Sequence, residues 1–123
     1  MTRVAILGGG PGGYEAALVA AQHDADVTVV DRDGIGGAAV LTDCVPSKTL
    51  VATAALMIAV EEAAELGVRA ASEVRADLEV VNRRVTRLAQ AQSGDVARRL
   101  AAEGVHVLSG SGRLDGPEAL LVE

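Results

Sequence analysis

The sequence predicts an α/β fold in which long helices cover a parallel sheet. Three short, mostly apolar runs, Val4–Leu7, Val27–Val30 and Val105–Leu108, are typical of strands in such a sheet. We expect Val4–Leu7 to be buried on both faces. Aromatic residues make up 1% of the 123 residues, so Val, Leu, Ile and Ala must fill the core, which suits closely packed helices on a sheet.

Composition excludes several classes of function. The net charge is −6 with no basic cluster, which argues against nucleic-acid binding. No uninterrupted apolar run approaches the roughly 20 residues of a membrane span. The N-terminus enters a strand without a signal-peptide pattern, and a single cysteine agrees with a reducing compartment. We therefore expect a cytoplasmic protein with no membrane span and no nucleic-acid partner.

A glycine-rich turn follows the first apolar run and leads into a helix over 14–21. Gly8, Gly10 and Gly13 fit the pattern G-x-G-x-x-G in the strand–turn–helix context that it requires. Gly8 permits the tight turn, Gly10 lets the backbone approach a pyrophosphate, and Gly13 lets the helix pack closely on the strand. The helix N-terminus would attract the negative charge.

An acidic residue ends the second apolar run. Asp31 lies 18 residues after Gly13, where a carboxylate can accept hydrogen bonds from ribose hydroxyls. The alternative is a solvated aspartate beside a chance glycine turn, but the βαβ context favours a dinucleotide site. Asp rather than Arg disfavours a 2′-phosphate, which leaves FAD or NAD. This motif alone does not separate the two.

The stretch from Gly36 to Lys48 carries the most unusual pattern. Pro46 suits the first turn of a helix and places Cys44 at its N-terminus, where the helix dipole favours a thiolate. Lys48 is one turn further along the same face. The alternative is a buried cysteine near a surface lysine, since a free cysteine is usually core filling.

The remaining sequence predicts two long helices and two more strands. The first helix should run from Cys44 to about Glu65 and close at Gly67. After a loop over 70–76, a second helix should begin at Asp77 and end at Gly104. Ser93, Gly94 and Asp95 are residues at which a kink or a division of this helix is expected. Its expected buried stripe contains Leu78, Val81, Val85, Leu88, Val96 and Leu100.

The end of the chain contains further signals. A glycine turn over 109–112 is followed by the start of another strand at Ala119–Val122. We expect this last strand to find no finished sheet to join. His23 and His106 stand alone without ligand spacing, so no metal site is expected.

Taken in order, these motifs resemble the N-terminal part of the flavoprotein disulfide reductases, a family that includes dihydrolipoyl dehydrogenase. The resemblance implies that the glycine turn with Pro11 and Gly12 binds the FAD pyrophosphate and Asp31 the ribose. It implies that Gly36 and Gly37 line the phosphates, Lys48 lies near flavin N5, and Gly112 lies near the adenine. The implied cofactor-binding set is Gly8, Gly10, Pro11, Gly12, Gly13, Asp31, Gly36, Gly37, Lys48 and Gly112, with Cys44 and Lys48 as catalytic residues.

One departure from the family decides the expected chemistry. Its redox pair has the form Cys-x-x-x-x-Cys, but this sequence has Ala39 and Cys44. A dithiol relay is therefore excluded within these residues. The pattern is most similar to flavoproteins that reduce quinones with NAD(P)H, in which the flavin would pass electrons directly to a quinone.

Members of the family are several times longer than this sequence, and three hypotheses for its function follow from that difference. Residues 1–123 would be the N-terminal part of an FAD-binding domain, truncated before the domain is complete, with the NAD(P)H-binding domain and the homodimer-forming interface domain absent. The first hypothesis is an FAD-binding segment of an NAD(P)H-dependent quinone reductase. The second is a single-cysteine redox flavoenzyme acting through Cys44. The third is a non-catalytic remnant or FAD-binding module.

Overall fold

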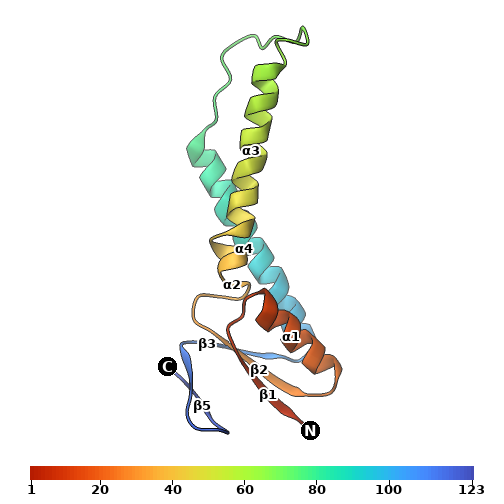
Figure 1. The fold of residues 1–123 in the computed structure, drawn as a ribbon, viewed down its shortest axis with the longest axis vertical. Helices are drawn as coiled ribbons and strands as arrows, with labels where there is room; N and C mark the ends of the chain where they lie inside the picture. The colour runs from red at the N-terminus through yellow and green to blue at the C-terminus, as the bar shows by residue number, and fades with distance from the viewer.

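A computed structural model describes all residues from 1 to 123 as a small sheet from which two long helices project (Figure 1). The elements in chain order are β1 (Arg3–Leu7), α1 (Pro11–Gln22), β2 (Asp26–Asp31), α2 (Gly37–Leu41), α3 (Cys44–Glu62), α4 (Leu78–Ala102), β3 (His106–Ser109), β4 (Gly112–Leu114) and β5 (Leu120–Val122). Both chain ends lie at the sheet end of the molecule (Figure 1). The predicted α/β class with a parallel sheet and long helices is confirmed.

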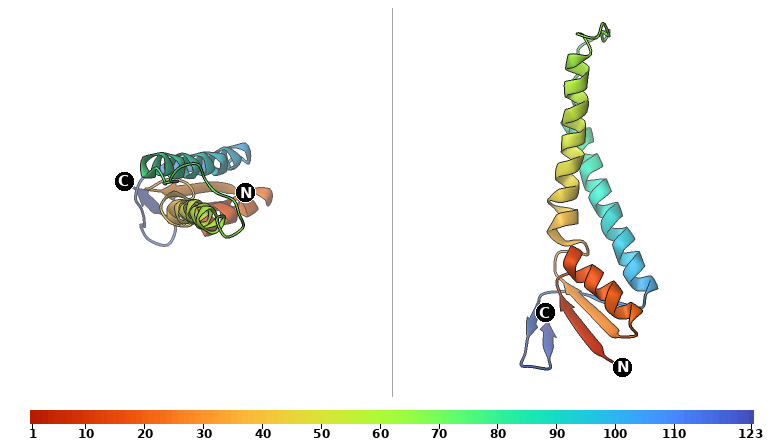
Figure 2. Two further views of the ribbon diagram at one scale, coloured as in Figure 1. Left: turned by 90° about the horizontal axis from the view of Figure 1, so that it is seen from above. Right: turned by 45° about the vertical axis from the view of Figure 1, so that its right-hand side comes forward.

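The sheet is parallel and has the strand order β1-β2-β3. Helices α1 and α4 lie on one of its faces, and the β4–β5 hairpin lies on the other (Figure 2). On the helix-covered face, Val27 and Val29 are buried together with Ala17, Leu18 and Leu100. This small aliphatic core fixes the position of the turn that follows β1.

The expectation that Val4–Leu7 is buried on both faces is wrong. Val4 and Ile6 pack against the core, whereas Ala5 is exposed and Leu7 is 44% exposed. Side chains alternate along a strand, so each face needs its own cover. Only the hairpin covers the second face of this sheet, and it does so near one end.

Helix α1 begins at Pro11, three residues earlier than the sequence predicts. Proline has no N–H to lose at a first helical position, and its fixed φ suits the helix. Gly12 and Gly13 are therefore helical. This start brings the helix N-terminus directly against the glycine turn.

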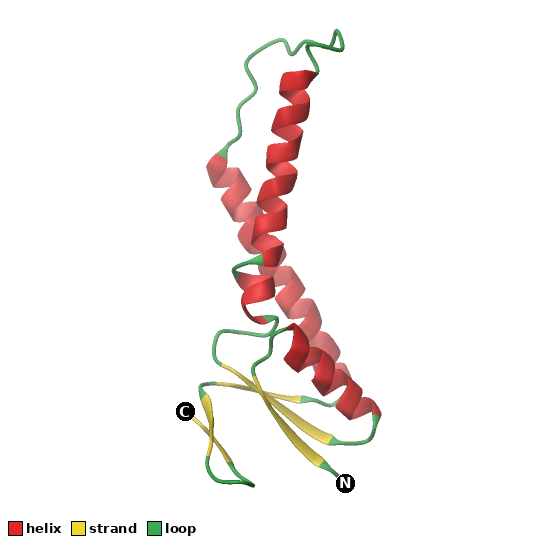
Figure 3. Cartoon of the chain, viewed as in Figure 1, coloured by secondary structure: helices red, strands yellow, loops and turns green.

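Helix α3 begins at Cys44, as predicted, and ends at Glu62 rather than near Glu65. Gly67 then closes the following turn with a φ of +84°. Helices α2 and α3 together, Gly37–Glu62, are long and apolar enough by length and composition to cross a membrane. One such helix is weak evidence for a span, and α3 packs along α4 in the structure (Figure 3).

Helix α4 is continuous from Leu78 to Ala102, so Ser93–Asp95 do not divide it. The Asp77 side chain caps it by accepting hydrogen bonds from the backbone of Glu79 and Val80. The predicted stripe is only partly right, because Leu78 is 75% exposed and Leu88 is 36% exposed. Val85 and Leu100 of that stripe are buried as predicted, and the helix also buries Ala89, which the stripe does not include. Its first turns extend beyond the sheet, where only α3 is available to pack on.

Strand β5 does join a partner, which corrects the expectation for Ala119–Val122. It pairs antiparallel with β4, with Arg113 opposite Leu121. The glycine turn is shorter than expected, because Gly112 already belongs to β4. The resulting hairpin crosses the open face of the parallel sheet.

Candidate functional site

The first glycine turn is built by close approach of α1 to β1. Gly8 has a φ of +98°, which favours glycine, and its N–H donates to the carbonyl oxygen of Val30 at 2.8 Å. A Cβ on Gly13 would clash with the Gly8 carbonyl oxygen. The turn and the first helical turn can therefore lie in contact only if residue 13 is glycine.

The carboxylate of Asp31 holds this turn in place. Its Oδ2 accepts a hydrogen bond from the Gly9 N–H at 2.6 Å. Its Oδ1 accepts from the N–H groups of Asp33 at 2.8 Å and Gly34 at 2.7 Å. One carboxylate thus joins the turn after β1 to the turn after β2.

A second glycine loop packs against the first. The Gly36 N–H donates to the Gly9 carbonyl oxygen at 2.7 Å. A Cβ on Gly37 would lie 3.0 Å from the Gly10 Cα, and one on Gly36 would lie 2.6 Å from the Val40 Cβ. The two glycine segments that the sequence singles out therefore lie side by side in the structure.

This pair of loops presents an open, donor-rich surface. The Gly12 and Gly13 N–H groups lie in the first turn of α1, where no side chain caps the helix and neither group makes a backbone hydrogen bond. A Cβ on Gly8, Gly10 or Gly12 would meet no atom within 4 Å. Free N–H groups, a helix N-terminus and open space beside the backbone are what a pyrophosphate needs. The glycine cradle therefore fits the phosphates of a dinucleotide.

Helix α2 connects this cradle to Cys44 and Lys48. Cys44 is an exposed free cysteine, and Lys48 is exposed one helical turn further on. The Lys48 ammonium has no ion-pair partner in the structure. Ala39 lies in α2, so no second sulfur is available to Cys44. The alternative of a buried cysteine is wrong.

Gly112 is the first residue of β4 and packs against the last residue of β1. A Cβ there would clash with the Leu7 side chain and lie 3.1 Å from Val30 Cγ1. The glycine lets the hairpin approach the ends of β1 and β2. Its expected position near an adenine stays a prediction.

Two residues of the site, Gly9 and Ser93, are not among the site residues predicted from the sequence. Gly9 is buried, and a Cβ there would lie 2.7 Å from the Ile35 Cδ1. The run of three glycines is the signal that could have pointed to it. The Ser93 hydroxyl donates to the Ile35 carbonyl oxygen at 2.5 Å and so ties α4 to the second glycine loop. No local pattern indicates this contact, because the two residues are 58 positions apart.

An exposed ion pair follows Asp31. The Arg32 guanidinium donates to both carboxylate oxygens of Asp33 at 3.1 Å. This hydrogen bonding, aided by the positive charge, lowers the pKa of Asp33 from its ordinary value. The Arg32 guanidinium is therefore held in an ion pair with Asp33.

Arg32→Ala is expected to raise the pKa of Asp33 toward the ordinary value of an aspartate. A carboxyl with a depressed pKa in the folded state stabilises the fold above its unfolded pKa, and that contribution is lost as the pH falls through the folded value. An NMR titration of the Asp33 carboxyl below pH 5 measures the change. If the Asp33 carboxyl titrates in the variant as it does in the wild type, Arg32 is not what lowers the pKa of Asp33.

The parallel sheet with its covering helices and the glycine cradle define an α/β protein of the Rossmann type. The family model for pyridine nucleotide-disulphide oxidoreductases matches residues 2–119. The chain belongs to this family.

Individual relatives agree with this assignment. The chain is 49% identical over 118 residues to an NAD(P)H dehydrogenase (quinone) of Mycobacterium tuberculosis, covering 93% of this chain and 24% of the relative. It is 33% identical to a dihydrolipoyl dehydrogenase of Acholeplasma laidlawii, covering 97% of this chain and 35% of the relative. The crystal structure of LpdA from Mycobacterium tuberculosis superposes with a TM-score of 0.84 at 48% identity, over 94% of this chain and 25% of LpdA. The chain spans about a quarter to a third of the length of these relatives.

Proposed function

We propose that this chain is the N-terminal part of the FAD-binding domain of an NAD(P)H-dependent oxidoreductase that reduces quinones without a redox disulfide. The observation that carries the proposal is the glycine cradle, in which the Gly12 and Gly13 N–H groups make no backbone hydrogen bond, open space lies beside Gly10 and Gly12, and Gly37 packs against Gly10. Similarity to an NAD(P)H dehydrogenase (quinone) supports the substrate class.

The residues of the glycine cradle each have a defined part in this proposal. Gly8, Gly10, Pro11, Gly12 and Gly13 shape the turn and offer N–H donors to the pyrophosphate. Gly36 and Gly37 close the second side of the cradle, and Gly112 supports the sheet end near the adenine. The chemistry supplied by a bound flavin is hydride acceptance from NAD(P)H and electron transfer to the quinone.

Asp31 and Lys48 supply the charges. The Asp31 Oδ2 accepts one backbone hydrogen bond and keeps a lone pair for a ribose hydroxyl. The pairing of Arg32 with Asp33 leaves no free guanidinium in this turn for a 2′-phosphate, which supports FAD over NADP. Lys48 would hold its positive charge where a reduced flavin carries negative charge.

Other parts of the activity would lie outside this segment. No second glycine-rich nucleotide motif follows Gly13, so the NAD(P)H site and the homodimer interface would be formed by the remaining length seen in the relatives. The single cysteine supports work in the reducing cytoplasm.

A titration with FAD tests the proposal. Gly10→Val is expected to abolish FAD binding while the chain stays folded, because the side chain would enter the cradle and its Cβ would meet no protein atom within 4 Å. Ser72→Val, an exposed loop position, is the matched control and should bind like the wild type. Flavin fluorescence quenching measures binding, and circular dichroism measures folding. A folded wild-type chain that does not bind FAD would overturn the cofactor proposal.

A second candidate function is single-cysteine redox chemistry. The exposed free Cys44 at the start of α3 favours it. In the enzyme completed by its remaining domains, Cys44→Ser should then abolish turnover with thiol-type acceptors. Quinone reduction that is unaffected by this substitution would eliminate the candidate.

A further inference from the structure

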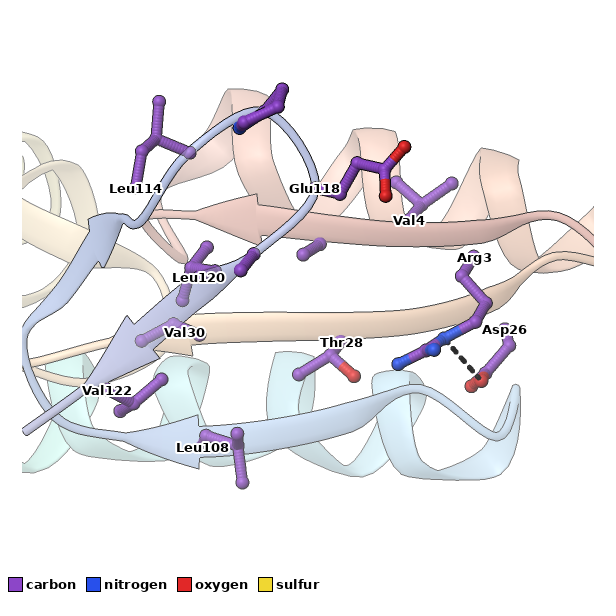
Figure 4. A pocket seen from close by; sticks show the side chains of 13 residues that line it. Arg3, Val4, Asp26, Thr28, Val30, Leu108, Leu114, Glu118, Leu120 and Val122 are labelled. Carbon is purple, nitrogen blue, oxygen red and sulfur yellow. Dashed lines mark ion pairs between the residues drawn. The ribbon is translucent and has the colours of Figure 1, made fainter.

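An open cleft of about 490 Å³ lies between the β4–β5 hairpin and the helix-free face of the sheet (Figure 4). Its walls are mostly aliphatic, and Arg3 and Asp26 lie 4.0 Å apart as an ion pair at one end. A ligand site needs polar groups that converge on one point, and this cleft lacks such a group. The polar contacts that can organise a ligand site lie instead around the glycine cradle.

One of these contacts comes from the middle of α4. Ser93 is half-buried, and its hydroxyl donates to the Ile35 carbonyl oxygen at 2.5 Å. A serine inside a helix commonly donates to a carbonyl in the preceding turn of its own helix. A hydroxyl has one proton to donate, and here that proton goes to a carbonyl 58 positions away in the sequence.

The Ile35 carbonyl depends on this hydroxyl. Ile35 is a buried residue, 6% exposed, and its carbonyl oxygen accepts no backbone hydrogen bond. A buried carbonyl without a donor is unfavourable, so the segment around it would shift until the oxygen met another donor or water. The Ser93 hydroxyl therefore fixes where residues 34–37 lie relative to α4.

The segment that Ser93 holds forms one side of the glycine cradle. A Cβ on Gly9 would lie 2.7 Å from the Ile35 Cδ1, so the Ile35 side chain packs directly on the first glycine turn. The next residue, Gly36, donates its N–H to the Gly9 carbonyl oxygen at 2.7 Å. A shift at Ile35 would change both of these contacts.

The packing of α4 on the sheet does not depend on this hydrogen bond. Leu100 is fully buried in the core, and Val96 and Ala97 pack against the same core. These apolar contacts keep α4 in place when the hydroxyl is removed, because they are worth more than one hydrogen bond. The effect of losing the hydroxyl is therefore local to the second glycine loop.

We propose that Ser93 is a positioning residue for cofactor binding, which acts by holding the Gly36–Gly37 loop against the first glycine turn. This inference rests on the proposed FAD function. Ser93 acts through Ile35 and is not itself a ligand of the cofactor. A binding site keeps its geometry only when a second layer of contacts holds its first layer, and Ser93 supplies such a contact from a helix distant in sequence.

A titration with FAD, followed by flavin fluorescence, tests the proposal. Ser93→Ala removes the hydroxyl and introduces a good helix former, so the chain should stay folded while its Kd for FAD rises about tenfold. Ser93→Thr keeps a hydroxyl and should bind FAD like the wild type. Ser93→Val has the shape of threonine without the hydroxyl and should bind as weakly as Ser93→Ala.

Thr53→Ala is the matched control. Thr53 is also half-buried on a long helix, and its hydroxyl donates to a backbone carbonyl, that of Thr49 within α3. Its removal should leave FAD binding unchanged. Circular dichroism measures the folding of all four variants.

Amide hydrogen exchange reports the position of the loop in the chain without FAD. The Gly36 N–H should exchange about tenfold faster in Ser93→Ala, while the paired strands β1 and β2 keep their wild-type protection. A general loss of stability would raise exchange in the strands as well.

Two results overturn the inference alone. If the wild type binds FAD and Ser93→Ala binds it equally well, Ser93 does not position the loop for the cofactor. If Ser93→Thr is as impaired as Ser93→Val, the hydroxyl is not the cause of the loss. A wild-type chain that does not bind FAD overturns the proposed function, and the role of Ser93 in cofactor binding is overturned with it.

Discussion

Gly13→Ala is expected to destabilise the chain by about 3 kcal/mol or more and to abolish FAD binding. The added Cβ would clash with the Gly8 carbonyl oxygen and lie 3.0 Å from the Gly8 carbonyl carbon. These are backbone atoms, so the strain can be relieved only by moving α1 away from β1. That movement would open the core at Ala17 and Leu18. Urea unfolding followed by circular dichroism measures the loss.

Gly12→Ala is the matched control for stability. It lies in the same helical turn, but a Cβ there meets nothing within 4 Å. Alanine is a better helix former than glycine by about 1 kcal/mol, so the control should be as stable as the wild type or slightly more stable. If both variants unfold at the wild-type midpoint, the close approach of α1 to β1 is not what the fold requires.

Asp31→Ala is expected to cost about 2 to 4 kcal/mol of unfolding free energy. The carboxylate accepts hydrogen bonds from Gly9, Asp33 and Gly34, and its removal leaves three N–H groups without their acceptor. The Gly9 group is the most costly, because that residue is buried. Since the Gly9 turn also forms one wall of the cradle, FAD binding should weaken in parallel.

Two further variants separate the role of Asp31 from a general loss of charge. Asp33→Ala removes an exposed carboxylate from the same turn and leaves the three Asp31 bonds intact, so its unfolding midpoint should change little. Asp31→Asn retains one acceptor oxygen, so its unfolding midpoint should lie between those of Asp31→Ala and Asp33→Ala. Equal midpoints for Asp31→Ala and Asp33→Ala would contradict the bridging role of Asp31.

The candidate site could be predicted from sequence to the extent that it is local. The G-x-G-x-x-G pattern identifies Gly8 and Gly13 because each meets a demand set within a few residues, a φ of +98° at Gly8 and the close approach to the Gly8 carbonyl oxygen at Gly13. It identifies Gly10 because that glycine leaves open space beside the turn. Pro46 likewise predicts the start of α3 near Cys44, and the structure begins the helix there. The contact between the two glycine loops, through Gly9 and Gly36, involves residues brought together only by the pairing of β1 with β2.

Errors in the predicted fold arose where burial depends on distant cover. Val4–Leu7 has the composition of a fully buried strand, but the helices cover one face and leave Leu7 partly exposed. Leu78 and Leu88 follow the helical period of α4, yet they project where little packs against that part of the helix. The spacing of apolar residues indicates which face of a helix is buried. It does not indicate how far along the helix the neighbouring elements extend to cover that face.

The sequence by itself determined the three parallel strands, the helices α1, α3 and α4, the glycine turn and the family, because these depend on short-range sterics and on motif spacing. It did not indicate helix α2 or strand β4. The tertiary structure alone decided that Asp31 bridges two turns, that Ser93 supports the second glycine loop, and that one face of the sheet stays open. These features depend on atoms from segments far apart in the chain, and their proximity is set by the packing of the whole fold.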